Sequence, residues 1–319
     1  MTKGSLQYWP RKRARKRLPR IRSYNNHGSE NCFSNIIGYK VGMRQLTLID
    51  DSQSSSKGLE VNKACTFVEI PKLEVYGLRF YKKDNITNYS NTYQEIHNQA
   101  ICQNNLNMKK IKINETKINE FKQKLNEFSD ISALLVAYPG TISIGQHKVV
   151  KFEAKIVGKN IQQKFDFAAN FFGKEIKASD IFKNGEFIDV TSISKGKGWQ
   201  GAIKRHGVSR LNHKATQKTR HVGVLGSFGI GRVLYSVPHS GQLGFNYRTE
   251  YSKRILKIAN DKIETNSGFL NYGNIKNEYI IIEGSIPGPV KRLVRIRKTM
   301  RNKNMREIKE PKINQLIMN

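Results

Sequence analysis

Short apolar runs follow the polar start of the chain. IIGYKVGM (36–43), ACTFVEI (64–70) and VYGLRFY (75–81) are rich in β-branched and aromatic residues, and clusters of Gly, Pro and Ser separate them. Runs of this kind are typical of strands in a β-barrel or sandwich. The alternation returns after residue 250 in KRILKIAN, GFLNYGNI and EYIIIEGSIPG, and LVRIR predicts a last strand before a basic tail.

The middle of the chain has a different pattern. Apolar residues recur at helical spacing between 115 and 130, at Ile118, Phe121, Leu125 and Phe128. ALLVAY (133–138) and KVVKFEAKIVG predict strands, and FDFAANFFG predicts a short helix that ends at Gly173. We therefore expect residues 85–178 to form an α/β insertion between barrel segments.

Two segments contain no acid. Residues 190–249 lack Asp and Glu, carry ten Lys or Arg and four His, and show no sustained apolar period in their first half. A structureless segment of this length is uncommon in a compact domain, so we expect an extended loop that enters a polyanion. Residues 1–29 carry nine Lys or Arg. They predict an arm that packs little core and becomes ordered on a partner.

The overall charge favours the same kind of partner. Lys and Arg number 56 against 25 Asp and Glu, which gives a formal net charge of +31. Such self-repulsion weakens a compact state unless a polyanion neutralises it, and each phosphate contact releases a counterion. An anionic membrane is the competing partner. However, no apolar run approaches the roughly 20 residues of a membrane span, and there is neither a basic amphipathic helix nor the apolar segment of a signal peptide.

A glycine motif offers an alternative function. SKGKGWQG (194–201) contains G-x-G-x-x-G after an apolar run, as in the turn of a dinucleotide-binding enzyme. That turn requires an acid about 20 residues later and a helix. Here the next acid is Glu250, and Gly207 interrupts the following sequence. An NAD-dependent enzyme, which would bind NAD tightly even at high salt, remains the rival hypothesis.

We interpret these glycines instead as allowing close passage along a phosphate backbone, because cations and Trp199 surround them. Structured RNA is favoured over DNA, since no helix-turn-helix, zinc-finger or leucine-zipper pattern is present. A DNA-compacting protein is the second rival. It would bind duplex DNA as well as RNA at matched salt.

Catalytic and metal sites are not expected. The spacings of His206, His213, His221 and His239 match no zinc motif, and Ser227 lies in no nucleophile elbow. No paired carboxylates suggest hydrolysis. Cys32, Cys65 and Cys102 form no C-x-x-C spacing and are expected to be reduced thiols. We predict no catalytic residue, no cofactor and no metal.

Several motifs together resemble one family. GSLQYWPRKRA, IIGYKVGM, IDVTSISKGKGWQGAIKRHGV, VPHSGQLGFNYRTEYSKRI and GFLNYGNIKNEYIIIEGSIPG occur in that order from end to end. They resemble the motifs of universal ribosomal protein L3 of the large subunit, in its archaeal and eukaryotic form. The resemblance implies a mixed, mainly β fold: a translation-protein-like β-barrel with an α/β insertion, a long basic central loop and basic terminal extensions.

The resemblance also implies a division of the chain. We expect a basic arm (1–30), barrel strands (31–84), the α/β insertion (85–178), a further barrel strand (179–194), an rRNA-penetrating loop (195–240), the second barrel part (241–298) and a basic C-terminal tail (299–319).

The function implied is that of a structural constituent of the large ribosomal subunit in the cytoplasm. It would bind 23S-type rRNA, support early subunit assembly and extend its loop towards the peptidyl transferase centre and the aminoacyl-tRNA entry corridor. The implied partners are this rRNA and the ribosomal proteins L14 and L24e, with no membrane. The residues expected to bind rRNA are Arg11, Lys12, Arg13, Arg15, Lys16, Arg17, Lys195, Lys197, Trp199, Lys204, Arg205, His206, Arg210, His213, Lys214, Lys218, Arg220, His221, Arg232, Arg248, Lys291 and Arg292.

The expected loop tip, near the peptidyl transferase centre, is Gly226, Ser227 and Phe228. Relatives usually read G-x-W-x-P at this point, whereas this chain reads GSFGI. Phenylalanine keeps an aromatic face for stacking but lacks the indole N–H. His206 likewise stands where these relatives often have tryptophan.

Overall fold

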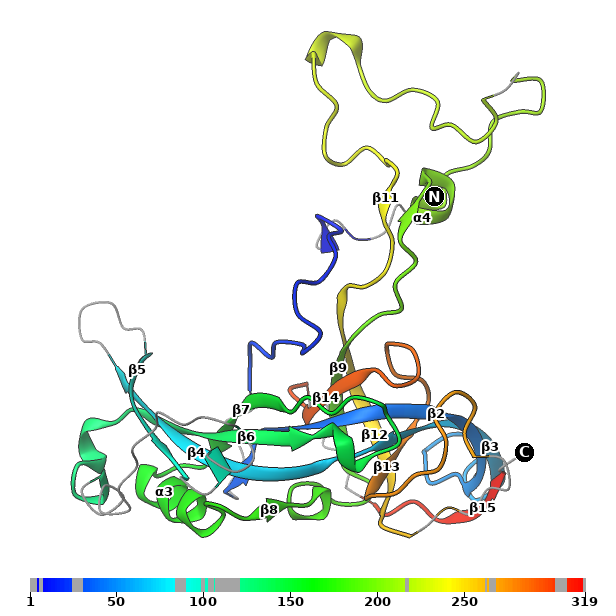
Figure 1. Cartoon of the computed structure of the whole chain (residues 1–319). Helices are drawn as coiled ribbons and strands as arrows, with labels where there is room; N and C mark the ends of the chain where they lie inside the picture. Colours follow the sequence, from blue (N-terminus) through cyan, green and yellow to red (C-terminus); the bar gives the residue numbers. More distant parts are fainter. Residues whose placement is uncertain are drawn as a thin grey trace.

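Two curled antiparallel sheets form the base of the molecule, and the arm and the central loop rise from it (Figure 1). The computed structural model describes residues 5, 8–24, 31–83, 90–98, 101–102, 106, 121–215, 218–261, 263, 268–301 and 309–317. Most of its regular structure is strand, so the prediction of a mainly β chain is confirmed. No helix in this described part is long and apolar enough to cross a membrane.

The first sheet, called the barrel sheet, has the strand order β14-β9-β12-β13-β3-β2-β15. β14 pairs with both β9 and β2, so the pairings of six strands return to their starting point, as in a barrel. β15 lies within the segment 299–319, which the sequence pattern predicts only as a tail. The strands are β2 (Asn35–Ile49), β3 (Glu60–Glu69), β9 (Phe187–Ile193), β12 (Tyr247–Ala259), β13 (Tyr279–Glu283), β14 (Leu293–Lys298) and β15 (Ile313–Ile317).

The second sheet has the order β1-β7-β6-β4-β5, with β8 paired to β4. Its members are β1 (Cys32–Phe33), β4 (Lys72–Lys83), β5 (Ser90–His97), β6 (Asp130–Tyr138), β7 (Val150–Val157) and β8 (Glu175–Ile176). β4 contains residues 75–81, which the sequence pattern assigns to the barrel. The structure corrects this, because β4 pairs with β5, β6 and β8. A run of apolar residues predicts a strand but does not specify its neighbours.

Helices are few in this region. Of the helix predicted at 115–130, residues 115–120 lie outside the described residues. The rest shows helix only at 121–123, followed by η2 (Leu125–Glu127), and β6 already begins at Asp130. α3 (Ile161–Asn170) packs on β6 and β7 and begins earlier than FDFAANFFG predicts. The chain then turns at Gly173, whose φ is 78°. The 3-10 helices η3 (Pro139–Thr141) and η4 (Ala178–Asp180) complete the connections.

One hydrophobic core joins the two sheets. Ile36 and Ile188 of the barrel sheet belong to the same buried cluster as Leu78 and Leu135 of the second sheet. On β13, alternate residues point to opposite faces, and Ile281 belongs to a second buried cluster. Burying one such side chain contributes roughly 1.5–3 kcal/mol. The base is therefore a continuous support for the loop.

The central loop leaves and re-enters the barrel sheet at one point. Ile193, the last residue of β9, is the direct partner of Tyr247, the first residue of β12. The intervening segment must therefore start and end side by side. Figure 1 shows it projecting away from the base as a stalk.

Candidate nucleic-acid interface

The lower part of the projecting loop is a hydrogen-bonded ribbon, here called the stem (residues 194–207 and 239–246). In it, β10 (Trp199–Gln200) pairs with β11 (Gly241–Gln242). The N–H of Lys197 donates to the Leu243 carbonyl at 2.9 Å, and the N–H of Leu243 donates to the Gly198 carbonyl at 2.9 Å. The stem is thus shaped by its own backbone bonds.

A short helix and one arginine close the stem. α4 (Ala202–His206) ends at Gly207, which has the left-handed φ of 67°. From α4, the Arg205 guanidinium donates to the carbonyl oxygens of Gln242 at 3.0 Å and His239 at 2.9 Å. Burial lowers the pKa of Arg205, and the nearby charge of Arg11 lowers it further. Arg205, predicted to bind rRNA, therefore cross-links the two sides of the stem.

The glycines of SKGKGWQG have more room than the sequence suggests. Gly198 has a φ of 63°, but a Cβ at Gly198 or Gly201 would meet no atom within 4 Å. The close backbone approach lies instead at Gly244, where φ is 71° and a Cβ would stand 2.0 Å from the Lys195 carbonyl oxygen. The motif leads into a five-residue helix, shorter than the helix that a dinucleotide-binding turn opens.

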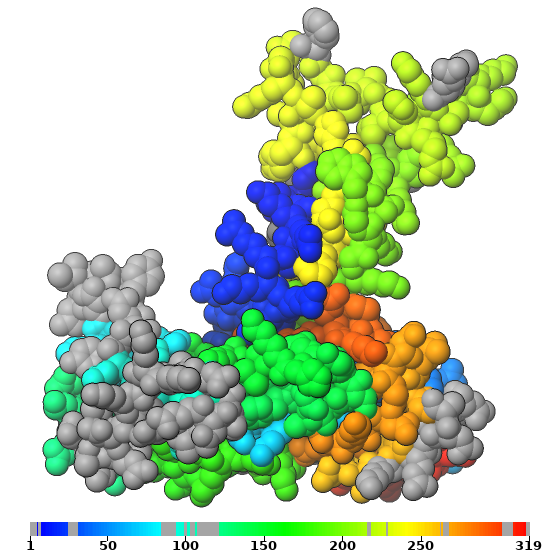
Figure 2. Space-filling model, viewed as in Figure 1, coloured from blue at the N-terminus to red at the C-terminus, as the bar shows by residue number. Residues whose placement is uncertain are grey.

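The N-terminal arm (residues 8–24) lies along the stem, as Figure 2 shows in dark blue. The N–H of Ala14 donates to the Phe245 carbonyl at 2.9 Å, and Arg11 Nη1 donates to the Arg205 carbonyl at 2.8 Å. Farther along the arm, Ile21 is buried. These contacts correct the prediction that the arm packs little, whereas its ordering by a partner stays a prediction. The apolar residues of the arm include Trp9, which contacts His206 of the stem, and the buried Ile21.

His206 is also corrected as a contact residue. It is only 5% exposed, and its ring lies 5.1 Å from the Trp9 ring, centroid to centroid. The Tyr235 ring meets the Trp9 ring in an edge-on arrangement, with centroids 6.3 Å apart. The histidine thus packs the arm onto the stem and offers little surface to a nucleic acid.

Most of the other predicted contact residues are exposed. Arg11, Arg248 and Arg292 are partly buried. Trp199 is 76% exposed. Exposed predicted residues occur in the arm, the stem, the outer segment 208–238 (called the distal loop) and beside the stem: Lys12, Arg13, Arg15, Lys16, Arg17, Lys195, Lys197, Trp199, Lys204, Arg210, His213, Lys214, Lys218, Arg220, His221, Arg232 and Lys291.

The distal loop adds apolar surface to this charge. Val224 is 88% exposed and Tyr235 is 75% exposed. η5 (Phe228–Ile230) lies in the outer part of the distal loop, with Gly226 and Ser227 exposed before it. Exposed apolar side chains among cations are a surface that a partner would cover.

Sequence reasoning missed a set of aromatic rings that carry arginines. Arg248 lies over Tyr8, with its Cζ 4.6 Å from the ring centroid, and Arg301 lies over Tyr251 at 4.4 Å. Phe245 carries two arginines. These pairs join residues that are far apart in the chain. The only sequence signal for them is that Tyr, Phe and Arg are all abundant.

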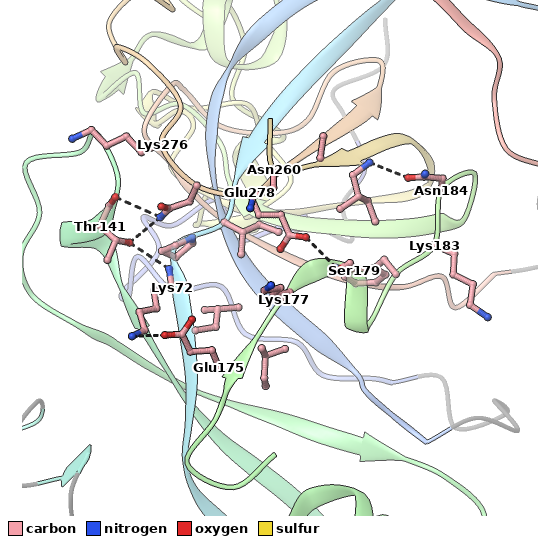
Figure 3. Close-up of a pocket in the computed structure, with 18 of the residues that line it drawn as sticks. Lys72, Thr141, Glu175, Lys177, Ser179, Lys183, Asn184, Asn260, Lys276 and Glu278 are labelled. Atoms are coloured by element: carbon pink, nitrogen blue, oxygen red, sulfur yellow. Dashed lines mark hydrogen bonds and ion pairs between the residues drawn. The ribbon is translucent and has the colours of Figure 1, made fainter. Parts of the chain in front are cut away.

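A cavity lies away from the projecting loop. Figure 3 shows this cleft of about 980 Å³ between the second sheet and the barrel sheet. Lys72 pairs there with Glu175, and the carboxylate of Glu278 accepts the N–H groups of Ala178 and Ser179. Charges of both signs line it: Lys72, Lys177, Lys183 and Lys276 beside Glu175, Glu278 and Glu310. The cleft therefore does not fit a polyanion.

A metal centre is not apparent either. In the part of the chain that the structure describes, no three His, Cys, Asp or Glu side chains are grouped closely enough to hold a metal ion. The three cysteines are buried free thiols.

Comparison with known proteins gives a consistent result. The family model described as "Ribosomal protein L3" matches residues 1–318. Proteins named "Large ribosomal subunit protein uL3" from Methanocorpusculum labreanum and Methanoregula boonei are 37% and 38% identical to the chain. The matches cover 93% and 94% of this chain, respectively, and 91% of each relative. The protein of that name from Methanothermobacter thermautotrophicus is 33% identical over 98% of this chain and 95% of its own length.

Proposed function

Because the chain belongs to the ribosomal protein L3 family, we propose that it binds large-subunit rRNA through the arm, the stem and the distal loop. Proteins of this family are structural components of the large ribosomal subunit and not enzymes. The ribosome is therefore the expected cellular location, in the cytoplasm.

One observation carries this proposal. The acid-free segment rises from a single point of the base, and nearly all of its cations are exposed. A projection of one charge sign is unfavourable alone and becomes favourable among phosphates, because each contact releases a counterion. Partly apolar side chains such as Val224 and Tyr235 can fill gaps or stack on bases.

Finer features of the function follow from the family. The base would rest on the RNA surface, while segments 1–30 and 195–240 penetrate it. Gly226, Ser227 and Phe228 would face the peptidyl transferase centre and the aminoacyl-tRNA corridor. The protein would act early in assembly, next to ribosomal proteins L14 and L24e. The exposed cations of the arm, stem and distal loop would contact rRNA.

Sedimentation tests the proposal. A tagged chain, expressed in an archaeal host whose own copy is depleted, should sediment with large subunits in a sucrose gradient. A variant with Arg210, Lys214, Lys218 and Arg220 changed to Gln should fold but enter subunits less efficiently, because it loses four candidate phosphate contacts. A parent chain that stays at the top of the gradient would contradict the proposal.

A further inference from the structure

Phe245 lies where the arm, the stem and the base meet. The Arg13 guanidinium stacks on its ring, with Cζ 5.4 Å from the ring centroid. The Arg292 guanidinium also stacks there, with Cζ 5.1 Å from the centroid. Arg13 comes from the arm, whereas Arg292 precedes β14 in the base. A guanidinium that stacks on a ring keeps the N–H groups of its edge available to an acceptor.

The position of Arg292 is fixed by the base. Its carbonyl accepts the N–H of Lys40 at 3.0 Å, and Lys40 Nζ also donates to the Gly288 carbonyl at 3.0 Å. Gly288 has a φ of 100°, and a Cβ there would stand 2.8 Å from Arg292 Cγ. The guanidinium is therefore held before any ligand arrives, which lowers the entropy cost of binding.

The arm brings Arg13 to the ring and Arg17 near Arg292. The bond from the Ala14 N–H to the Phe245 carbonyl holds Arg13 beside the ring. Burial lowers the pKa of the Arg292 guanidinium, and the nearby charge of Arg17 lowers it further. Two like charges thus meet at the ring, and a third lies near Arg292.

Among the described residues, no acid forms an ion pair with these arginines. The ion pairs formed there by arginines belong to Arg79, Arg254 and Arg297, and none involves Arg13, Arg17 or Arg292. The sequence around the ring is likewise acid-free from Val190 to Thr249. Like charges held close together without a counter-ion in the protein favour binding of an anion from outside.

We propose that Arg13 and Arg292, stacked on Phe245, form a site for one phosphate group, and that this phosphate locks the arm to the stem. The inference rests on the proposed function, because the phosphate is taken to belong to the rRNA backbone. The planar guanidinium edges suit the paired oxygens of a phosphate. The arm and the base would then be bridged through the RNA as well as through Phe245.

The first test compares matched variants of the full chain for binding to a large-subunit rRNA fragment. Arg292→Gln and Arg13→Gln should each weaken binding about tenfold, as expected for loss of a charge-assisted hydrogen bond. Phe245→Leu should weaken it several-fold with every charge retained. Lys57→Gln removes an exposed charge of the base, and Arg44→Gln removes an arginine that stacks on Phe269 at 5.0 Å. Both controls should change affinity about twofold or less.

The second test identifies the source of the phosphate. Neutral methylphosphonates are placed one at a time along the fragment. At one position, or two adjacent ones, the modification should weaken wild-type binding and have no further effect in Arg292→Gln. If instead inorganic phosphate at millimolar concentration protects the free arm from amide exchange and no RNA position depends on Arg292, the site takes a free anion and the rRNA assignment is overturned.

The outcomes separate the two proposals. If the wild-type chain does not bind the rRNA fragment, the proposed function itself fails. If it binds, but the three site variants behave like the two controls, only the phosphate site is wrong. Circular dichroism and urea unfolding of each variant show whether the barrel sheet is intact, so that a folding defect is not read as a lost contact.

Discussion

Arg205 is bonded across the stem to Gln242, and its Nε lies 3.0 Å from the Gln242 carbonyl oxygen. The guanidinium also reaches the His239 carbonyl at 2.9 Å. This cation of a basic segment therefore holds the stem in shape. Its acceptors are neutral backbone carbonyls, so its positive charge is not neutralised by these bonds.

This bond predicts how the stem responds to mutation. Arg205→Gln should raise amide exchange at residues 241–243 about tenfold or more, since it removes charge-assisted hydrogen bonds from a two-residue ribbon. Lys204→Gln, which removes the neighbouring exposed charge, is the control and should leave exchange unchanged. Hydrogen–deuterium exchange with mass spectrometry measures both. Equal exchange in the two variants would contradict the cross-linking role.

The two tryptophans should behave differently. Trp9 packs against His206 and Tyr235, whereas Trp199 is 76% exposed. Trp9→Ala should free the arm, because loss of such packing costs about 2 kcal/mol, and tryptic cleavage after Arg11–Arg17 should accelerate more than about tenfold. Trp199→Ala should leave the cleavage rate unchanged. Fast cleavage of the arm in the unaltered chain would show that the packing is not maintained in solution.

Two glycines of the stem form a matched pair. At Gly244 a Cβ would overlap the Lys195 carbonyl oxygen and φ is 71°, whereas at Gly201 the φ is −66° and no atom lies within 4 Å of a Cβ. Gly244→Ala should therefore disrupt the stem and lower incorporation into large subunits several-fold. Gly201→Ala should fold and incorporate normally. The prediction is wrong if the two alanine variants exchange their stem amides at the same rate.

A buried ion pair predicts the stability of the barrel sheet. Asp189 is fully buried, and its Oδ2 accepts Arg297 Nη2 at 3.0 Å. Asp189→Ala should lower the free energy of unfolding by about 3 kcal/mol or more, because it leaves a buried guanidinium without its partner. Lys82→Ala breaks a half-exposed pair with Glu127 and should cost less than about 1 kcal/mol. Urea unfolding of both variants checks this contrast.

Cys65 predicts a pH dependence. Burial raises the pKa of its thiol to about 11 in the folded chain, compared with about 8.5 in an unfolded one. The folded state therefore holds a proton that the unfolded state loses, so this contribution to stability declines as pH rises from about 8.5 to 11. The stability difference between the wild type and Cys65→Ala should shrink across that range in urea unfolding. A constant difference would argue against a buried, neutral thiol.

The sequence by itself determined the mainly β character, the acid-free projecting segment and the kind of partner. Apolar alternation and charge are properties of residues close together in the chain, and so is the succession of motifs that resembles the L3 family. Strands such as β6 and β7 could be predicted for the same reason.

Only the tertiary structure decided which strands are neighbours and which cations face outward. β4 joined the second sheet, and His206 became a packing residue under Trp9. The gathering of Arg13 and Arg292 at Phe245 could not be predicted either, since these residues are far apart in sequence. Strand pairing and ring stacking depend on contacts between distant segments, and local composition carries no information about which distant segments meet.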